Sequence, residues 1–267
     1  SQHQLEVMAQ YTSGDDRLHM AYTFDYLGGD FSAEHFRKSI ADTEAGAPDG
    51  WICLAFSNHD VVRHVSRWAV HGQEAAFTRL AAMLILSMRG SVCLYQGEEL
   101  GFKEAELAFE DLVDPYGIEF WPQFKGRDGC RTPMVWQAHA ANGAFSTANR
   151  TWLPVPAEHL VHAVDTQDRV DGSVLEFYRA LLAFRKEHPA LVKGRIELLE
   201  ASGDVLAFIR AEGAERLLCV FNMGGNAADF IVPPGLLPVA AGCPGVIAAV
   251  IDGEIDLEPF GAYIGTL

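Results

Sequence analysis

A run of apolar residues followed by three polar ones is the feature of this sequence most able to do chemistry. Residues 51–56 are almost all apolar and predict a buried parallel strand. Asn58, His59 and Asp60 follow after one serine, and in barrel-type α/β folds polar residues placed after a strand face the active-site mouth. A carboxylate beside an imidazole can bind vicinal hydroxyls and offset nearby positive charge. The alternative is a turn in which Asn58 and Asp60 cap the next helix.

Further motifs rich in glycine, aromatic and charged residues follow downstream. They occupy residues 95–101, 114–117, 120–122 and 126–136. In this order, together with Phe-Ser-Asn-His-Asp at 56–60, they resemble the α-amylase family of glycoside hydrolases, in particular its bacterial α-glucosidases and oligo-1,6-glucosidases. The last motif, Gly-Arg-Asp-Gly-Cys-Arg-Thr-Pro-Met-Val-Trp, is close to diagnostic of the α-glucosidase branch.

Three blocks that precede the Asn-His-Asp block in this family do not occur here. They are its first block, its Gly-x-Arg-x-Asp nucleophile block and its Gly-Glu acid/base block, and only 59 residues stand before Asp60. The resemblance therefore implies the C-terminal half of an enzyme. Such a half carries the third carboxylate of the catalytic trio without the other two, so we expect the isolated chain to be inactive.

The resemblance also implies roles for individual residues. Asp60 matches the aspartate that holds two ring hydroxyls and stabilises the oxocarbenium-like transition state of a retaining glycosidase. His59 matches the neighbouring histidine, which also binds sugar hydroxyls. Arg127 matches an arginine that reaches the glucosyl unit at the cleavage site. The alternative for Arg127 is a structural ion pair with Asp128 or with a carboxylate of the barrel.

Less specific matches complete the candidate site. Phe24 matches an aromatic residue that lines the sugar pocket, with a core phenylalanine as the alternative. Glu104 is assigned to the outer sugar subsite. Arg63 is interpreted as an orienting or structural partner of Asp60, and Arg131 as structural.

Composition narrows the class of protein. The 267 residues carry 36 acidic against 20 basic side chains, a net charge of −16, which disfavours nucleic acid as a partner but is compatible with a neutral sugar. No apolar run approaches the ~20 residues of a membrane helix. The five cysteines have no paired spacing, so no zinc site, other metal or cofactor is expected. Unpaired cysteines favour the cytoplasm, and a periplasmic protein with free thiols stays open.

Apolar periodicity predicts strands that alternate with helices in the first part of the chain. The strands are 19–26, 52–56 and 91–95, and the helices are 33–41, 74–88 and 174–188. Alternation at this spacing implies right-handed parallel crossovers. The resemblance identifies the strands as the sixth to eighth of a (β/α)₈ TIM barrel.

After about residue 192 the pattern changes to short apolar runs separated by Gly, Pro and Asn. The runs are 196–199, 205–210, 216–222, 229–232, 246–251 and 262–267. Such runs are typical of an antiparallel β-sandwich. The predicted fold is therefore α/β: residues 1–191 form the C-terminal portion of a barrel, strands 6–8, and residues 192–267 form an all-β sandwich domain.

These observations favour an α-glucosidase-like retaining glycoside hydrolase that acts on short α-glucosides or oligosaccharides. One alternative is a transglycosylase or a sucrose-isomerase-like enzyme, which would use the same site chemistry. Another is a non-catalytic scaffold that resembles the heavy subunits of amino-acid transporters, although Asp60, His59 and Arg127 argue against it. The third alternative is a fragment with no activity of its own.

Three parallel strands leave an open sheet edge, and exposed edges of apolar strands promote association. We therefore expect this chain to occur with a complementary N-terminal half of the barrel, or else as an oligomer. Sedimentation velocity measures this directly. A stable, soluble monomer of 29.2 kDa with a cooperative melt would contradict the expectation.

Overall fold

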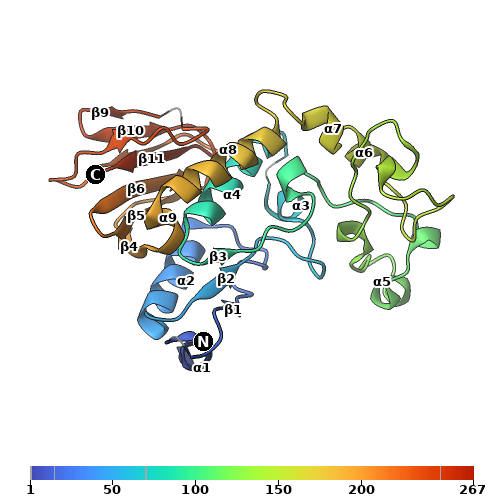
Figure 1. Ribbon diagram of the computed structural model, residues 1–267, viewed down its shortest axis with the longest axis horizontal. Helices are drawn as coiled ribbons and strands as arrows, with labels where there is room; N and C mark the ends of the chain where they lie inside the picture. Colours follow the sequence, from blue (N-terminus) through green and yellow to red (C-terminus); the bar gives the residue numbers. More distant parts are fainter. Residues whose placement is uncertain (1, 15, 70, 247) are drawn as a thin grey trace. The chain divides into compact units, whose positions relative to one another are not determined.

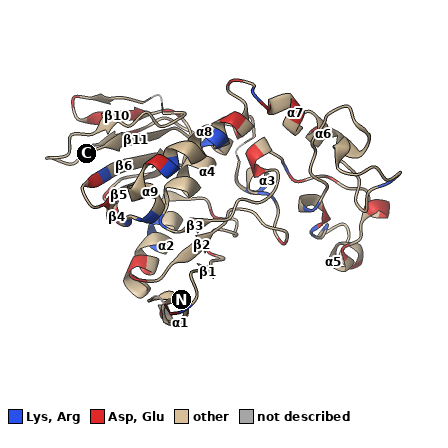
Figure 2. Ribbon diagram, viewed as in Figure 1, with Lys and Arg blue, Asp and Glu red and all other residues tan. Residues whose placement is uncertain are grey.

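The computed structural model describes residues 2–14, 16–69, 71–246 and 248–267. The chain divides into two compact units: the first contains the described residues within 1–55, 70–93 and 180–267, and the second those within 56–69 and 94–179. Acidic side chains occur on elements of both units (Figure 2). The predicted boundary between residues 191 and 192 divides the chain at one point, whereas these units are each made of more than one segment. That boundary stays a prediction.

A small parallel sheet lies in the first unit. Its strands are β1 (Ala21–Tyr22), β2 (Ile52–Leu54) and β3 (Ser91–Val92). They pair in the order β1-β2-β3, and both pairings are parallel, which confirms the predicted arrangement. The strands are shorter than predicted. After β1, for example, the Thr23 hydroxyl accepts a hydrogen bond from the Asp25 N–H at 3.2 Å, which begins a turn instead of extending the strand.

Among the residues that the structure describes, five helices belong wholly or partly to this unit. They are α1 (Gln2–Thr12), α2 (Ala33–Gly46), α4 (Glu74–Ser87), α8 (Val174–Glu187) and α9 (Pro189–Lys193). α2, α4 and α8 confirm the predicted helices. α2 starts at Ser32, whose hydroxyl accepts from the His35 N–H. Pro189 begins α9 because proline lacks only an N–H that a first helical turn leaves unused. Among the helices of the described residues, none is long and apolar enough to cross a membrane.

In the described residues after α9, eight strands form two antiparallel sheets (orange to red in Figure 1). They are β4 (Arg195–Leu199), β5 (Val205–Glu212), β6 (Glu215–Asn222), β7 (Ala228–Ile231), β8 (Val239–Ala240), β9 (Val250–Ile251), β10 (Glu254–Leu257) and β11 (Ala262–Thr266). The orders are β4-β5-β6-β11-β8 and β7-β10-β9. Every pairing is antiparallel, as predicted. β8 and β10 were not predicted, and β9 is shorter than the predicted run 246–251. Residue 247 of that run lies outside the described residues.

The two antiparallel sheets share one hydrophobic core. Val205, Ile209 and Val220 of the larger sheet pack with Phe230 and Ile255 of the smaller one. Burying such side chains is worth about 1.5–3 kcal/mol each. This shared core makes the two sheets one packed body.

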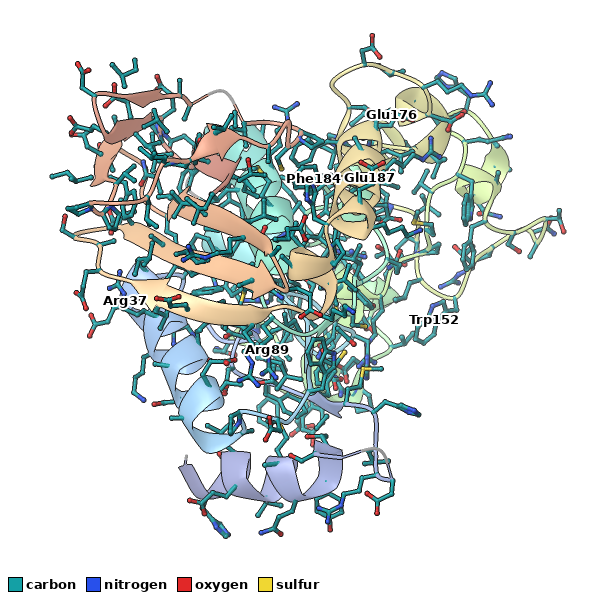
Figure 3. All side chains as sticks on the ribbon, turned by 60° about the vertical axis from the view of Figure 1, so that its left-hand side comes forward. Arg37, Arg89, Trp152, Glu176, Phe184 and Glu187 are labelled. Carbon is teal, nitrogen blue, oxygen red and sulfur yellow. The ribbon has the colours of Figure 1, made fainter. Side chains whose placement is uncertain are left out.

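Two arginines link the two antiparallel sheets to helices of the same unit by hydrogen bonds. Arg37 of α2 donates to the Val205 carbonyl of β5 at 3.0 Å (Figure 3). Arg210 of β5 is fully buried and donates to the carbonyls of Ser87 and Gly194. Burial lowers the pKa of Arg210 to about 10, and the carbonyl partners offset the cost of burying its charge.

The second unit consists of loops braced by short helices. The helices are α3 (His64–Trp68), α5 (Pro115–Glu119), α6 (Ala157–Leu160), α7 (Val164–Gln167) and the first residues of α8. The 3₁₀ turns lie at Glu98–Leu100, Phe109–Asp111, Asp128–Cys130 and Ala141–Ala144. A small core of Leu100, Phe102, Val135, Ala163 and Leu175 holds them together. The described residues of this unit form no continuous sheet. Its geometry depends on this small core and on the hydrogen bonds of its loops.

His159 is a buried histidine in this core. Its ring stacks on Phe102 with centroids 4.2 Å apart, and its Nε2 lies 2.9 Å from the Lys103 carbonyl oxygen. Burial lowers the pKa of His159 to about 4, so the folded chain keeps the ring neutral. Below the usual histidine pKa of about 6.5 the unfolded chain takes up a proton that the folded chain refuses. The contribution of His159 to stability is thus complete above that pH and falls as the pH drops towards 4.

We expect His159→Gln to flatten the pH dependence of stability between about pH 6.5 and 4, where wild type should lose roughly 3 kcal/mol through this residue. Urea unfolding at several pH values in this window measures the slope. The exposed His139 supplies the matched control, His139→Gln. Equal slopes for wild type and His159→Gln would show that His159 does not carry the effect.

Candidate active site

The turn that carries Asn58, His59 and Asp60 is fixed by short local hydrogen bonds. The Asn58 side-chain oxygen accepts from the Asp60 N–H at 2.8 Å, which makes an Asx turn. α3 begins at His64, whose N–H donates to the Ser57 hydroxyl at 2.8 Å. The alternative in which Asn58 and Asp60 cap the next helix is therefore wrong, and the Asp60 carboxylate is free for other contacts.

Asp60 lies against two arginines. Its Oδ1 accepts from Arg127 Nη1 at 3.1 Å and from Arg131 Nη2 at 3.0 Å, and about half of its side chain stays exposed. His59 Nε2 lies 3.3 Å from the other carboxylate oxygen, Oδ2. The structure thus brings together Asp60, His59 and Arg127, three of the residues that sequence analysis singled out.

Arg131, which was interpreted as structural, also contacts Asp60, and this contact was not predicted. Its Nε donates to the His59 carbonyl at 2.7 Å while its Nη2 reaches Asp60. Arg131 therefore fixes the backbone of the turn and the carboxylate together. Arg131 follows Arg127 by four residues, across the 3₁₀ turn Asp128–Cys130. This spacing was the one signal in the sequence that could have indicated that both arginines contact Asp60.

Arg127 is held from behind by Asp114. The Asp114 carboxylate accepts from Arg127 Nε at 2.9 Å, from Nη2 at 3.0 Å and from the backbone N–H at 2.8 Å. The hydrogen bond from Arg127 holds the pKa of the Asp114 carboxyl well below its usual range, and the same bond raises the pKa of Arg127. A bidentate pair of this kind fixes the plane of the guanidinium. Nη1 is then directed to Asp60.

Asp114 is itself positioned by local structure. It precedes α5, where it accepts from the Tyr116 N–H and is followed by Pro115 at the first helical position. The buried Asp128 accepts from the N–H groups of Val113 and Asp114 at 2.7 and 2.8 Å. Asp128 therefore binds backbone and supports Asp114, and the alternative that paired Arg127 with Asp128 is wrong.

A close approach of two glycines shapes the loop before Arg127. Gly126 has a φ of +76°, and a Cβ added there would lie 2.8 Å from the Gly117 Cα. A side chain at 126 would be strained by both the backbone angle and the contact. The Gly-Arg sequence of this motif is thus required for the arginine to reach Asp114.

Glu104 and Arg63 lie in the same unit but are engaged elsewhere. Glu104 Oε2 accepts from the Arg63 N–H at 2.9 Å, and burial raises the pKa of its carboxyl. The Arg63 side chain is buried and donates to the carbonyls of Gln96 and Cys130 at 2.6 and 3.0 Å. Arg63 therefore has a structural contact set. The assignment of Glu104 to an outer subsite stays a prediction.

Phe24 belongs to the first unit. It is 73% exposed and makes an edge-to-face contact with Tyr22, with ring centroids 5.4 Å apart. Both rings line a hollow of about 550 Å³ together with polar residues that include Asp25 and His35. The ring is not part of the hydrophobic core of the described residues, and its sugar-binding role stays a prediction.

The chemistry available to the second unit follows from these contacts. A carboxylate flanked by two guanidinium groups offers both acceptors and donors to paired hydroxyls. A retaining glycosidase also needs two carboxyl groups about 5–5.5 Å apart as nucleophile and acid/base. Asp114 is buried, ion-paired and held in the charged form, so it cannot donate a proton. The cluster around Asp60 is therefore suited to binding and charge stabilisation.

Comparison with known proteins agrees with this chemistry. The family described as "Alpha amylase, catalytic domain" matches residues 1–194. A probable alpha-glucosidase of Rhizobium meliloti is 48% identical over the whole chain, which covers 48% of that relative. A glucan 1,6-alpha-glucosidase of Streptococcus pneumoniae is 31% identical over 80% of the chain and 46% of the relative.

Solved structures give the same picture. An alpha-glucosyl transfer enzyme, XgtA, superposes with a TM-score of 0.91 at 44% identity, covering 98% of this chain and 48% of that enzyme. The trehalulose synthase MutB from Pseudomonas mesoacidophila superposes with a TM-score of 0.83 at 26% identity, covering 98% and 53%. The chain spans about half the length of the relatives it matches, consistent with a partial barrel. It belongs to the alpha-amylase family of glycoside hydrolases.

Proposed function

We propose that this chain is the part of an α-glucosidase-like retaining enzyme that binds the terminal glucosyl unit and stabilises its transition state. The observation that carries the proposal is the pair of hydrogen bonds from Arg127 and Arg131 to Asp60. In this proposal Asp60 holds ring hydroxyls and offsets the positive charge of the oxocarbenium-like transition state. His59 and Arg127 bind the same sugar. Phe24 and Glu104 are proposed, from the resemblance alone, to bind sugar as well.

The remaining half of the catalytic machinery would come from outside these residues. The nucleophile and the acid/base carboxylate would lie on an N-terminal barrel half that completes strands 6–8, and residues 192–267 would form a β-sandwich domain. The substrate class is short α-glucosides or oligosaccharides, and the protein is proposed to be cytoplasmic. The Rhizobium meliloti relative, named a probable alpha-glucosidase, supports this substrate class.

Complementation tests the proposal. The purified chain alone should release no p-nitrophenol from p-nitrophenyl α-glucoside, because one carboxylate cannot perform two displacements. A chimera that joins the first half of the Rhizobium meliloti relative to this chain should hydrolyse the substrate with retention, read from the product anomer by NMR. Activity of the isolated chain, or a folded chimera without activity, would contradict the proposal.

Glucosyl transfer is the second candidate function, favoured by the 44% identity to an alpha-glucosyl transfer enzyme. The same glucosyl-enzyme intermediate serves both reactions, and the acceptor decides between them. Incubating the chimera with sucrose or p-nitrophenyl α-glucoside and an added alcohol separates them. Transfer would give an alkyl α-glucoside by chromatography, and sucrose isomerisation would give an isomeric disaccharide. Hydrolysis would give free glucose together with fructose or p-nitrophenol, and no new glucoside.

A further inference from the structure

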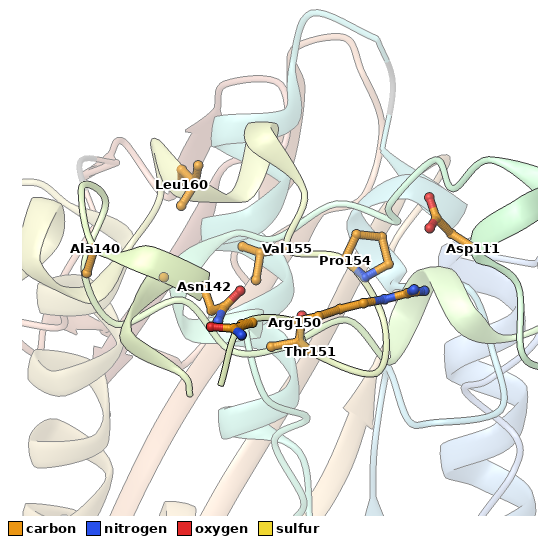
Figure 4. Close-up of a pocket in the computed structure, with 10 residues that line it drawn as sticks. Asp111, Ala140, Asn142, Arg150, Thr151, Pro154, Val155 and Leu160 are labelled. Atoms are coloured by element: carbon orange, nitrogen blue, oxygen red, sulfur yellow. The ribbon is translucent and has the colours of Figure 1, made fainter. Parts of the chain in front are cut away.

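A cavity of about 360 Å³ lies in the second unit, away from the residues that bind Asp60. Its ten lining residues include the polar Asp111, Asn149 and Arg150 and the apolar Val155 and Leu160 (Figure 4). Ligand pockets run from about 300 to 1,000 Å³. This volume therefore suits a small molecule such as a monosaccharide or disaccharide.

The backbone beside the cavity is held in an unusual conformation. Asn142, Gly143 and Ala144 have φ values of 52°, 59° and 58°, which are unfavourable for the two residues that carry a Cβ. The Gly143 carbonyl accepts from the Trp136 N–H at 2.8 Å, and Asn142 Nδ2 donates to the Ala148 carbonyl at 2.6 Å. These bonds hold the wall of the cavity in place before any ligand binds. Local strain that is retained in this way is typical of binding sites.

The polar groups of the cavity have unused hydrogen-bonding capacity. Within the part of the chain that the structure describes, the side chains of Asn149 and Arg150 make no hydrogen bond or ion pair, although both line the cavity. The Arg150 side chain extends to the side of the cavity on which Asp111 lies in this view (Figure 4). An arginine offers five donors, and an amide offers two donors and an acceptor.

The chemistry of the lining selects a neutral, hydroxyl-rich ring. Asp111 balances the charge of Arg150, so the cavity has no net preference for an anion or a cation. Val155 and Leu160 lie across the cavity from Arg150 and Thr151 (Figure 4), and they can pack against C–H groups. A pyranose presents hydroxyls at its edge and C–H groups on its faces, which matches both walls.

We propose that this cavity is a second sugar site, which binds a neutral hexopyranose such as the glucosyl unit of sucrose without taking part in catalysis. Arg150 and Asn149 donate to its hydroxyls, and Asp111 accepts from them. This site goes beyond the proposed activity, because its lining includes none of the residues that contact Asp60. It would bind sugar whether or not the enzyme is complete.

Titration of the isotope-labelled full chain with sucrose, followed by ¹H–¹⁵N NMR, tests the site. The amides of residues 140–151 should shift in a saturable manner. The same shifts should persist in Asp60→Asn, which removes the proposed catalytic contact. Arg150→Ala and Asn149→Ala should each weaken binding about tenfold or more, because each removes hydrogen bonds to the ligand. Arg150→Lys should give an intermediate affinity, since it keeps the charge but loses the planar fork.

Matched controls make the result decisive. Arg169 is exposed and lies 3.7 Å from its neighbour Asp168, so Arg169→Ala should leave the titration unchanged. Thermal melts show which variants are folded. If Arg150→Ala is unfolded, the result for Asn149→Ala tests the proposal. The proposal is overturned if residues 140–151 do not shift, if folded variants bind like wild type, or if inorganic phosphate competes with sucrose. Inactivity of the chimera would refute the proposed function and leave this binding result standing.

Discussion

Replacing Asp60 by asparagine in the chimeric enzyme is expected to lower kcat by about 10²–10³-fold and to leave KM nearly unchanged. The amide keeps the size of the side chain and one acceptor oxygen, so ground-state contacts with hydroxyls persist. It lacks the negative charge that faces the oxocarbenium-like centre, and only the transition state develops that centre. Initial rates on p-nitrophenyl α-glucoside over a range of concentrations separate the two constants.

The control for this experiment is Asp171→Asn, which removes an exposed carboxylate of the same unit. Its kcat and KM should match those of the unchanged chimera. A rise in KM with an unaltered kcat in Asp60→Asn would show that Asp60 only binds the substrate. The assignment of Asp60 to the transition state would then be wrong.

Asp114→Asn is expected to have the second largest effect, because Asp114 fixes Arg127 through three hydrogen bonds. Misplacing the guanidinium by about 1 Å should lower kcat/KM by up to about 10²-fold. Arg127→Met should lower it by at least as much. If Asp114 acts only through Arg127, the double variant should be no worse than Arg127→Met alone. Additive losses would show that Asp114 has an independent role.

The same variant has a signature in stability that needs no activity. The pKa of Asp114 is depressed in the folded chain, so its contribution is complete above the usual aspartate value of about 3.9 and is lost as the pH falls below it. Asp114→Asn should lower the free energy of unfolding at neutral pH by about 1.5–3 kcal/mol. It should also remove part of the acid-induced loss that wild type shows below about pH 4. Urea unfolding of the isolated chain at pH 7 and 3.5 measures both effects.

The longer helices were predictable from the sequence because their apolar segments are long. α4 shows this well: its residues from Phe77 onward are nearly all buried, and the predicted range differs by one residue. Strand ends were less predictable, because a side chain such as Thr23 ends a strand by hydrogen bonding to a nearby N–H. β10, Glu254–Leu257, was missed although its polar and apolar residues alternate as a strand requires.

The candidate site was predictable only in part. Asp60, His59 and Arg127 were found because they stand in short motifs of recognisable order. The link from Asp114 to Arg127 joins residues 13 positions apart, and no local period reports such a pair. The contact of Arg131 with Asp60 was likewise not predicted, because the order of the motifs does not show which of their side chains meet. Loop geometry, rather than composition, decides these contacts.

Arg63 has a consequence for protein engineering. Its guanidinium joins the loop that follows β3 to the Gly-Arg-Asp-Gly-Cys segment through the main-chain oxygens of Gln96 and Cys130. Main-chain atoms accept these bonds, so the link depends on the path of the two backbone segments more than on the side chains at 96 and 130. A change of chain length on either side would move an acceptor away from the guanidinium. Loop exchange between relatives should therefore transfer residues 63–131 as one cassette, so that the guanidinium and both of its main-chain acceptors keep their spacing.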